Sequence, residues 1–185
     1  LVVSRTAQGV HDRVDTSPEH GPDSFLELDL SVDGATASVV DWVRDLGEQV
    51  DIVINNLGGT MGIDDPLAPW DQFRRVLDFN LGAAVEINRQ FVPSMRERRW
   101  GRVCHVSSIA ALENQGPPSY CASKAALNAY VRSVGRYVAH DNVILTAIMP
   151  GAVFTSGGYW DIASQSRPEH VDKFINERMA IKRFG

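Results

Sequence analysis

Three residues in the middle of the sequence have side chains that could carry out proton transfer. Tyr120 and Lys124 lie four residues apart, one turn of a helix, and Ser108 precedes Tyr120 by twelve residues. An ammonium group about 4 Å from a phenol favours the phenolate by on the order of 4 kcal/mol at an effective dielectric of about 20, so Lys124 could make Tyr120 a usable acid or base. Taken alone, the pair also fits a packed helix start, because short motifs of this kind occur by chance.

A fourth polar residue, Asn80, lies on the apolar stripe of a predicted helix, between Leu77 and Ala84. A buried amide group needs hydrogen-bond partners. The position fits an asparagine that is satisfied by neighbouring backbone as well as it fits one with a functional role.

The elements that must position these residues are short apolar runs that alternate with longer helical patterns. This alternation is typical of an α/β fold with a parallel sheet, in which ligands bind at the carboxyl ends of the strands, and Ser108 follows such a strand. The segment Thr6–Ser24 is poorly periodic and is predicted as a weak helix or a loop. The predicted strands are Leu1–Val3, Phe25–Leu28, Val50–Ile54, Arg102–Val106 and Val143–Ile148, and the predicted helices surround Val39–Leu46 and span Trp70–Trp100 and Tyr120–His140.

Composition narrows the class of protein. The chain has 185 residues, 44% of them hydrophobic, which predicts one domain with a sizeable core. A net charge of −5 argues against a nucleic-acid partner, and no apolar run is long enough for a membrane span. Cys104 and Cys121 form no metal-binding or disulfide pattern and are predicted to be inert, which favours a cytoplasmic protein without a metal site.

Beyond these residues, the sequence resembles the short-chain dehydrogenase/reductase family, of the single-domain type that uses a nicotinamide cofactor. The resemblance covers essentially the whole chain and implies a Rossmann-type, doubly wound parallel sheet with three α/β/α layers, formed by residues 1–185 as one domain. The stretches that carry it stand in the family's order: "VSRT" after the first strand, "LDL" at Leu28–Leu30, "NNLGG" at Asn55–Gly59, "FNLGAA" at Phe79–Ala84, "GRVCHVSS" at Gly101–Ser108, "YCASK" at Tyr120–Lys124 and "MPGAVFT" at Met149–Thr155.

The resemblance implies a catalytic role for four residues. Tyr120 would be the general acid/base, and Lys124 would favour its ionised form and hold the nicotinamide ribose. Ser108 would orient the substrate carbonyl, and the family's spacing favours it over its neighbour Ser107. Asn80 would keep a water molecule that links Lys124 to solvent.

The resemblance also implies a set of cofactor-binding residues. Arg5 stands where family members that prefer NAD usually have an acidic residue nearby, so NADP(H) is the expected cofactor, through pairing of Arg5 with the 2′-phosphate. Leu57 departs from the family's small residue at its position. The full predicted set is Ser4, Arg5, Asp29, Leu30, Asn55, Gly58, Tyr120, Lys124, Pro150, Gly151, Val153 and Thr155.

Two parts of the family pattern are missing from the sequence. The family begins with a strand, a glycine-rich turn and a helix that receives the pyrophosphate, whereas this sequence opens at the second strand and stops before the last one. In the strand order 3-2-1-4-5-6 the missing strand is central, so two strand edges inside the sheet are expected to lack a partner. We therefore expect a fold that is incomplete at both ends, in a fragment or an incomplete record of a longer protein.

The predicted activity is hydride transfer between NADP(H) and a carbonyl or secondary alcohol. Alternatives are a cofactor-binding module without turnover and a relative of the sugar-nucleotide epimerases or dehydratases. The polar segment Glu113–Gln115 favours a small polar substrate, over which Tyr159 and Trp160 could close unless they pack on the core. Ser166 with Glu169 predicts a capping box. The long helices predict a homodimer or homotetramer.

Overall fold

The computed structural model describes residues 1–5, 25–32, 34–113 and 115–185. The predicted weak helix or loop at 6–24 and the predicted substrate-loop residue Asn114 lie outside the described residues. The chain divides into two compact units, Leu1–Ile148 and Met149–Gly185, and each is described by itself. That residues 1–185 form one domain stays a prediction.

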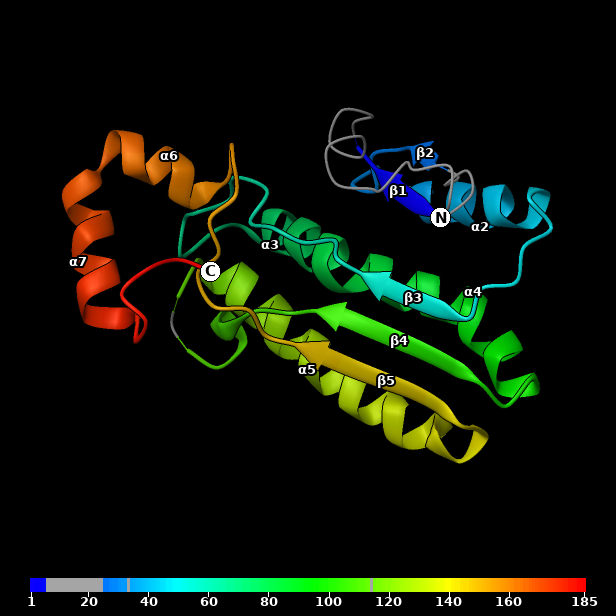
Figure 1. Ribbon diagram of the computed structural model, residues 1–185. Helices are drawn as coiled ribbons and strands as arrows, with labels where there is room; N and C mark the ends of the chain where they lie inside the picture. Colours follow the sequence, from blue (N-terminus) through cyan, green and yellow to red (C-terminus); the bar gives the residue numbers. More distant parts are fainter. Residues whose placement is uncertain (6–24, 33, 114) are drawn as a thin grey trace, which may run out of the picture. The chain divides into compact units, whose positions relative to one another are not determined.

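The first unit confirms the α/β class with parallel strands (Figure 1). Its strands form two separate parallel sheets, one of order β1-β2 and one of order β3-β4-β5. The division falls between β1 and β3, where the sequence predicts that a central strand is missing. The strands are β1 (Val2–Ser4), β2 (Phe25–Glu27), β3 (Ile52–Asn55), β4 (Gly101–Val106) and β5 (Val143–Ile148), each within two residues of its predicted start and end.

The helices of the first unit follow the predicted order. The long helix expected over Trp70–Trp100 is helical almost throughout, but a π-helical segment interrupts it where Asn80 lies. The helices are α2 (Ala35–Asp45), α3 (Trp70–Leu77), the π-helical segment Asp78–Gly82, α4 (Ala83–Glu97), the short 3₁₀ helix Ile109–Ala111, α5 (Pro118–Val138) and the 3₁₀ helix Ala139–Asp141.

The two faces of the β3-β4-β5 sheet differ in burial. Helices α4 and α5 lie along one face (Figure 1), onto which alternate strand residues such as Val53, Val103 and Leu145 point. Val103 is 1% exposed, whereas Ile54, on the opposite face, is 67% exposed. The core therefore lies between the sheet and the α4/α5 layer, and a second cluster around Val39 joins α2 to it.

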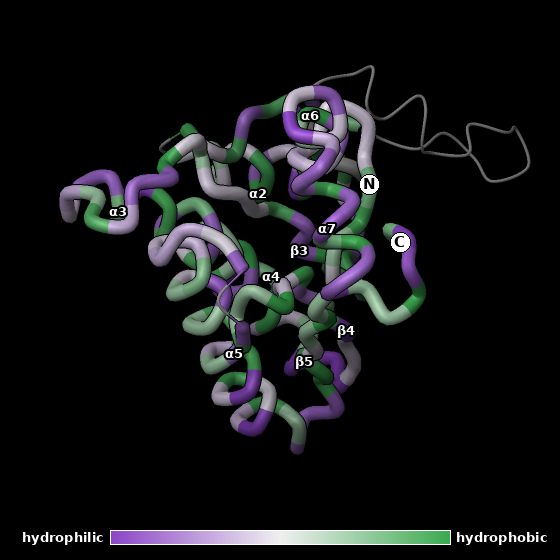
Figure 2. The backbone as a smooth tube through the Cα atoms, turned by 90° about the vertical axis from the view of Figure 1, so that its left-hand side faces the viewer, coloured by the Kyte–Doolittle hydropathy of each residue, from purple (hydrophilic) through white to green (hydrophobic). Residues whose placement is uncertain are grey.

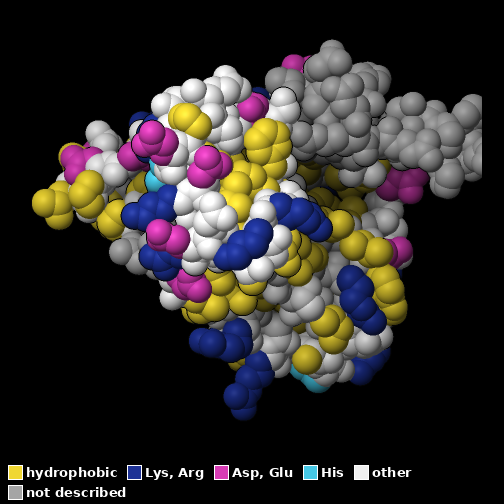
Figure 3. Space-filling model, turned by 60° about the vertical axis from the view of Figure 1, so that its left-hand side comes forward, with side chains coloured by type: hydrophobic (Ala, Val, Ile, Leu, Met, Phe, Trp, Pro, Cys, Tyr) yellow, Lys and Arg dark blue, Asp and Glu magenta, His cyan; other side chains and the backbone are white. Residues whose placement is uncertain are grey.

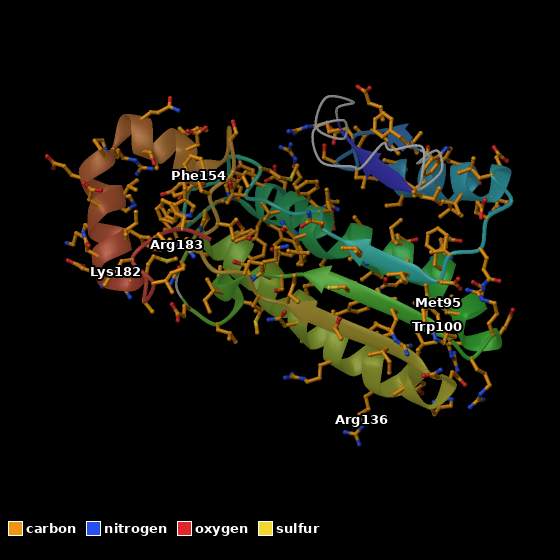
Figure 4. All side chains as sticks on the ribbon, viewed as in Figure 1. Met95, Trp100, Arg136, Phe154, Lys182 and Arg183 are labelled. Carbon is orange, nitrogen blue, oxygen red and sulfur yellow. The ribbon has the colours of Figure 1, made fainter. Side chains whose placement is uncertain are left out.

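Where β4 begins, helix α4 and the strand lie very close together. Met95 of α4 is fully buried (Figure 4), and Gly101 is the first residue of β4. A Cβ atom at Gly101 would lie 2.5 Å from the Met95 sulfur, so a larger residue would push α4 away from the strand. Arg136 of α5, by contrast, points away from the sheet (Figure 4).

The second unit contains α6 (Tyr159–Ser166) and α7 (Pro168–Arg178). Much of both helices is hydrophilic (Figure 2). Trp160 lies at the centre of an aromatic cluster, with its ring centroid 4.3 Å from that of Phe174 and 5.0 Å from that of Phe184. The structure therefore places Trp160 in the packing of this unit, which was the alternative to a role over the substrate.

The capping box predicted at Ser166 is wrong. Ser166 is the last residue of α6, and its hydroxyl donates back to the Ile162 carbonyl at 2.8 Å. The next helix begins at Pro168, whose fixed φ angle and missing N–H suit the first turn, and no described side chain caps it.

Candidate active site

The start of α5 brings Tyr120 and Lys124 onto one helix face. Pro117 precedes the helix and Pro118 occupies its first turn, which fixes the helix start next to these residues. The Lys124 ammonium nitrogen lies 5.8 Å from the centre of the Tyr120 ring. The pair predicted from the one-turn spacing is therefore adjacent in space.

Lys124 is a buried cation. Its side chain is 2% exposed, and its Nζ donates to the Val106 carbonyl at 3.0 Å, at the carboxyl end of β4. Burial lowers the pKa of Lys124 from 10.5 to about 8, so the group remains mostly protonated at pH 7. An ammonium group has three hydrogens, which leaves capacity for partners beyond Val106.

Gly58 and Asn80 meet at this ammonium group. A Cβ atom built on Gly58 would lie 2.5 Å from Lys124 Nζ and 2.8 Å from Asn80 Oδ1, so only glycine fits without displacing them. The Asn80 amide is bound on both sides: Nδ2 donates to the Gly59 and Val76 carbonyls at 2.8 Å each, and Oδ1 accepts from Gly59 N–H at 3.0 Å. Asn80 thus fixes the loop after β3 against the π-helical segment.

The two serines after β4 have different surroundings. Ser107 is buried, and its hydroxyl donates to the Lys124 carbonyl at 3.4 Å, which ties the end of the strand to α5. Ser108 is half-buried, and its Oγ accepts from Ala110 N–H at 3.1 Å as the cap of the 3₁₀ helix Ile109–Ala111. Ser108 is therefore the more accessible of the two hydroxyls, as its predicted role requires.

Some of the predicted cofactor residues of the first unit also come together. Leu30 and Asn55 line one cavity of about 20 Å³ with Leu57 and Asn80, which connects the loop after β2 to the loop after β3. Arg5 is exposed at the end of β1, directly after Ser4. Hydrogen bonds from Ser31, and to a smaller extent the charge of Arg5, hold the pKa of Asp29 below its usual value.

The remaining predicted cofactor residues belong to the second unit. Gly151 has open space where a Cβ would stand, and Val153 is partly exposed. The Thr155 carbonyl accepts from Gly158 N–H at 2.9 Å and so closes the turn that leads into α6. Pro150 directly precedes this stretch.

The sequence reasoning missed a buried polar network beside the predicted site. His105 of β4 is fully buried, and its ring lies between the amides of Asn55 and Asn88, with Tyr130 beyond Asn88. Burial, and next the charge of Lys124, lower the pKa of His105 from 6.5 to about 4. A polar residue at an inward position of an apolar strand and an asparagine on an apolar helix stripe were the signals that could have revealed it.

The described residues contain no group of three or more His, Cys, Asp or Glu that could hold a metal ion. In the same part of the chain, no helix combines the length and the apolar character that a membrane span requires. On the face in Figure 3, basic and acidic side chains are interspersed with hydrophobic ones.

The family model described as "short chain dehydrogenase" matches residues 1–159. The chain belongs to the short-chain dehydrogenase family. A curated member of this family, 2-dehydro-3-deoxy-L-rhamnonate dehydrogenase (NAD(+)) of Sphingomonas sp. (strain SKA58), is 34% identical over 174 residues, which cover 92% of this chain and 67% of the relative.

Solved structures of short-chain dehydrogenases agree with the fold. A 3-oxoacyl (acyl-carrier-protein) reductase from Agrobacterium tumefaciens C58 with NADP bound aligns with a TM-score of 0.84 at 28% identity and covers 99% of this chain and 70% of its own. L-Sorbose reductase from Gluconobacter frateurii, complexed with NADPH and L-sorbose, aligns with a TM-score of 0.83 at 26% identity, with 99% and 73% covered. The Rossmann-type α/β fold predicted from the sequence is thereby confirmed.

The chain is shorter than its short-chain dehydrogenase relatives. It spans 59% to 67% of the length of the first two curated relatives that it matches. The family places the chain among oxidoreductases, and the activity of the whole protein is treated below as a proposal.

Proposed function

We propose that the full-length protein is an oxidoreductase that transfers a hydride between NADP(H) and the carbonyl or secondary alcohol of a small polar substrate. The observation that carries the proposal is the buried ammonium group of Lys124, held at the end of β4 beside Tyr120 and facing the bare backbone of Gly58. A buried lysine costs free energy, and a catalytic role accounts for that cost.

The residues around Lys124 fit a nicotinamide cofactor. Gly58 carries no side chain over the ammonium group, and Asn80 fixes the neighbouring backbone. Hydroxyl oxygens of a ribose are suitable acceptors for the N–H groups of Lys124 that Val106 does not use. Relatives with NADP bound or complexed with NADPH support this choice of cofactor class.

The proposed mechanism uses three side chains of the first unit. When bound, the nicotinamide supplies the hydride for the carbonyl carbon, or accepts it in the reverse direction. In carbonyl reduction Tyr120 donates its hydroxyl proton to the carbonyl oxygen as negative charge develops there, and Lys124 stabilises the phenolate that remains. Ser108 donates a hydrogen bond to the same oxygen and orients it toward Tyr120.

Arg5 is the proposed determinant of cofactor preference. Its guanidinium is exposed at the end of β1, close enough to Asp29 to act on the carboxyl electrostatically, and a 2′-phosphate would offer it a stronger partner. The Arg5→Ala variant should bind NADPH more weakly by about 1.5 to 3 kcal/mol and bind NADH with nearly unchanged affinity. Equal weakening of both in fluorescence titrations would mean that Arg5 does not recognise the phosphate.

A small polar substrate is supported by the loop before α5. Glu113 is exposed and Gln115 half-buried, and the Gln115 amide donates to the Glu113 carboxylate at 2.5 Å. This loop lies between Ser108 and Tyr120 in the sequence. L-Sorbose reductase and the rhamnonate dehydrogenase act on polar substrates by their names, which supports the same class here.

Assembly and location complete the proposal. We infer a homodimer or homotetramer that pairs through α4 and α5, whose small residues such as Ala126 and Ala129 allow close helix packing. The two cysteines of the sequence, Cys104 and Cys121, are both free, which favours the reducing cytoplasm. Light scattering that finds a monomer of the full-length protein at micromolar concentration would contradict the assembly.

The direct test of the function is a substrate panel on the full-length gene product. Oxidation of NADPH and NADH should be followed spectrophotometrically with keto sugars, keto acids and apolar ketones. We expect NADPH oxidation with at least one polar ketone. Preferred turnover of apolar ketones would contradict the polar substrate, and failure to bind either cofactor would contradict the oxidoreductase.

A further inference from the structure

The network around His105 connects Asn55, a predicted cofactor-binding residue at the end of β3, to the buried core. Asn55 and His105 are direct register partners in β3 and β4, so both side chains point to the face covered by α4 and α5. Asn88 comes from α4 and Tyr130 from α5. Asn55 is the only member of the network that the sequence assigns to the cofactor.

Both ring nitrogens of His105 face an amide group. Nε2 lies 3.1 Å from Asn88 Nδ2, and Nδ1 lies 3.3 Å from Asn55 Nδ2. A neutral imidazole has one donor and one acceptor nitrogen, so it can accept from only one of these amides. The low pKa of His105 keeps the ring neutral near pH 7.

Exchanging the oxygen and nitrogen of the Asn55 or Asn88 side-chain amide does not remove this conflict between two donors and one acceptor. Asn55 Nδ2 also donates to Asn88 Oδ1 at 3.3 Å. Turning Asn55 alone would set two oxygens against each other, and turning Asn88 alone would set two nitrogens against each other. Turning both would require two N–H groups on the ring, which only the protonated form of His105 has.

At one of the two ring nitrogens of His105 a donor therefore faces a donor. The burial of the residues indicates which nitrogen this is. Asn88 and His105 are 2% and 0% exposed, and Asn88 Nδ2 also donates to the Tyr130 hydroxyl at 3.2 Å. Asn55 is only half-buried, and its contact with the ring is the longer one. An unsatisfied polar group costs less where water can reach it, so the mismatch belongs at Asn55.

We propose that His105 is a positioning residue: it accepts from Asn88 at Nε2, carries its proton on Nδ1, and so leaves one amide hydrogen of Asn55 uncommitted for the cofactor. A protonated Nδ1 cannot accept from Asn55 Nδ2, so among the described residues the hydrogen-bond acceptor that remains for this amide nitrogen is Asn88 Oδ1. The uncommitted N–H is then available to an acceptor oxygen of the bound dinucleotide. This inference rests on the proposed function.

Two substitutions of His105 separate the two ring contacts. In His105→Gln the side-chain amide reaches the position of Nε2, so it can accept from Asn88 and leaves Asn55 uncommitted. In His105→Asn the amide reaches the position of Nδ1, where its oxygen can accept from Asn55 and engage the second hydrogen. His105→Leu removes both contacts and reports the cost of losing the network.

We expect the glutamine variant of the full-length protein to bind NADPH within about threefold of wild type, and the asparagine variant to bind about tenfold more weakly, because one hydrogen bond is diverted. The value of kcat at saturating cofactor should change little in both. Thermal melting of all three variants checks folding. If His105 had a merely structural role, the NADPH affinity of the three variants would follow their melting temperatures. Either that result or equal NADPH affinities of the glutamine and asparagine variants would overturn the proposal.

A second measurement needs neither cofactor nor variant. Long-range ¹H–¹⁵N spectra of the cofactor-free protein should show the His105 Nδ1 resonance as protonated and Nε2 as unprotonated. The opposite tautomer would overturn the proposal even if the protein is an active dehydrogenase. Failure of wild type to bind NADPH or NADH would overturn the proposed function and the role of Asn55 with it, whereas the tautomer can still be read.

Discussion

The two faces of the β3-β4-β5 sheet are made by the same strands but have different chemistry. The face under α4 and α5 holds the network of Asn55 and His105. Lys124 lies next to this network and binds the Val106 carbonyl at the carboxyl end of β4. The opposite face presents Ile52 and Ile54, which are more than half exposed. Apolar residues predominate on both faces, which is typical of a parallel sheet covered on both sides.

The difference in burial between the two faces shows where the surroundings can change the chemistry of a polar side chain. On the covered face His105, Asn88 and Lys124 are almost fully buried, so their hydrogen bonds and surroundings decide their orientation and pKa. This desolvation lowers the pKa of Lys124 and keeps the ring of His105 neutral near pH 7. We conclude that the chemistry of the protein depends on the α4/α5 layer, and the predictions below test this contrast.

The largest expected effect is acid lability caused by His105. Its pKa is about 4 when folded and about 6.5 when unfolded, so the unfolded chain binds more protons between these values and stability falls as pH drops from 6.5 to 4. The loss should approach about 3 kcal/mol. Lys124 is the charged group acting on the ring, and Tyr130 stays neutral because burial raises its pKa.

Urea denaturation of the full-length protein at several pH values measures this loss. The control is His105→Asn, which has no group that titrates in this range. The difference in stability between wild type and variant should shrink or reverse as the pH falls. A difference that is independent of pH would mean that His105 is not desolvated.

The second effect compares one residue from each face. Val103→Ala removes two methyl groups at a side chain that is 1% exposed and should cost about 2 kcal/mol of unfolding free energy. Ile54→Ala acts on a side chain that is 67% exposed and should cost about 0.5 kcal/mol or less. Similar costs at both positions would show that the second face is covered as well in the full-length protein.

The smallest expected effect has the opposite sign. Gly82 ends the π-helical segment with helical dihedral angles, and a Cβ there would be 3.7 Å from Asp78 Cβ, an ordinary contact. Gly82→Ala should therefore stabilise the protein by about 0.5 to 1 kcal/mol. Gly58→Ala, which would strike Lys124, is the matched opposite case. A lower melting temperature of Gly82→Ala would contradict this and show that the segment does not accommodate the added Cβ.

The sequence predicted the elements that depend on local pattern. β5 has the predicted bounds, and the Tyr120–Lys124 adjacency follows from helical spacing alone. The π-helical segment was not predicted, because one shifted hydrogen-bond register barely changes the apolar stripe. The cap predicted at Ser166 failed because Pro168 starts the helix by a different device.

The site was predictable only in part. A motif identifies Tyr120 and Lys124, but the burial of the ammonium group and its bond to Val106 depend on how α5 packs on the sheet. The pairing of Asn55 with His105 joins residues fifty positions apart, and the register between β3 and β4 determines it. Contacts set by strand register cannot be read from the periodicity of either strand.

The most direct test of the central claim is Tyr120→Phe in the full-length protein, assayed with the polar ketone that wild type reduces best. The variant lacks only the hydroxyl that donates the proton, so kcat should fall by about a hundredfold or more. The Kd for NADPH, measured by fluorescence titration, should stay within about twofold, a difference of roughly 0.4 kcal/mol. A phenylalanine variant that retains the kcat of wild type would contradict the account.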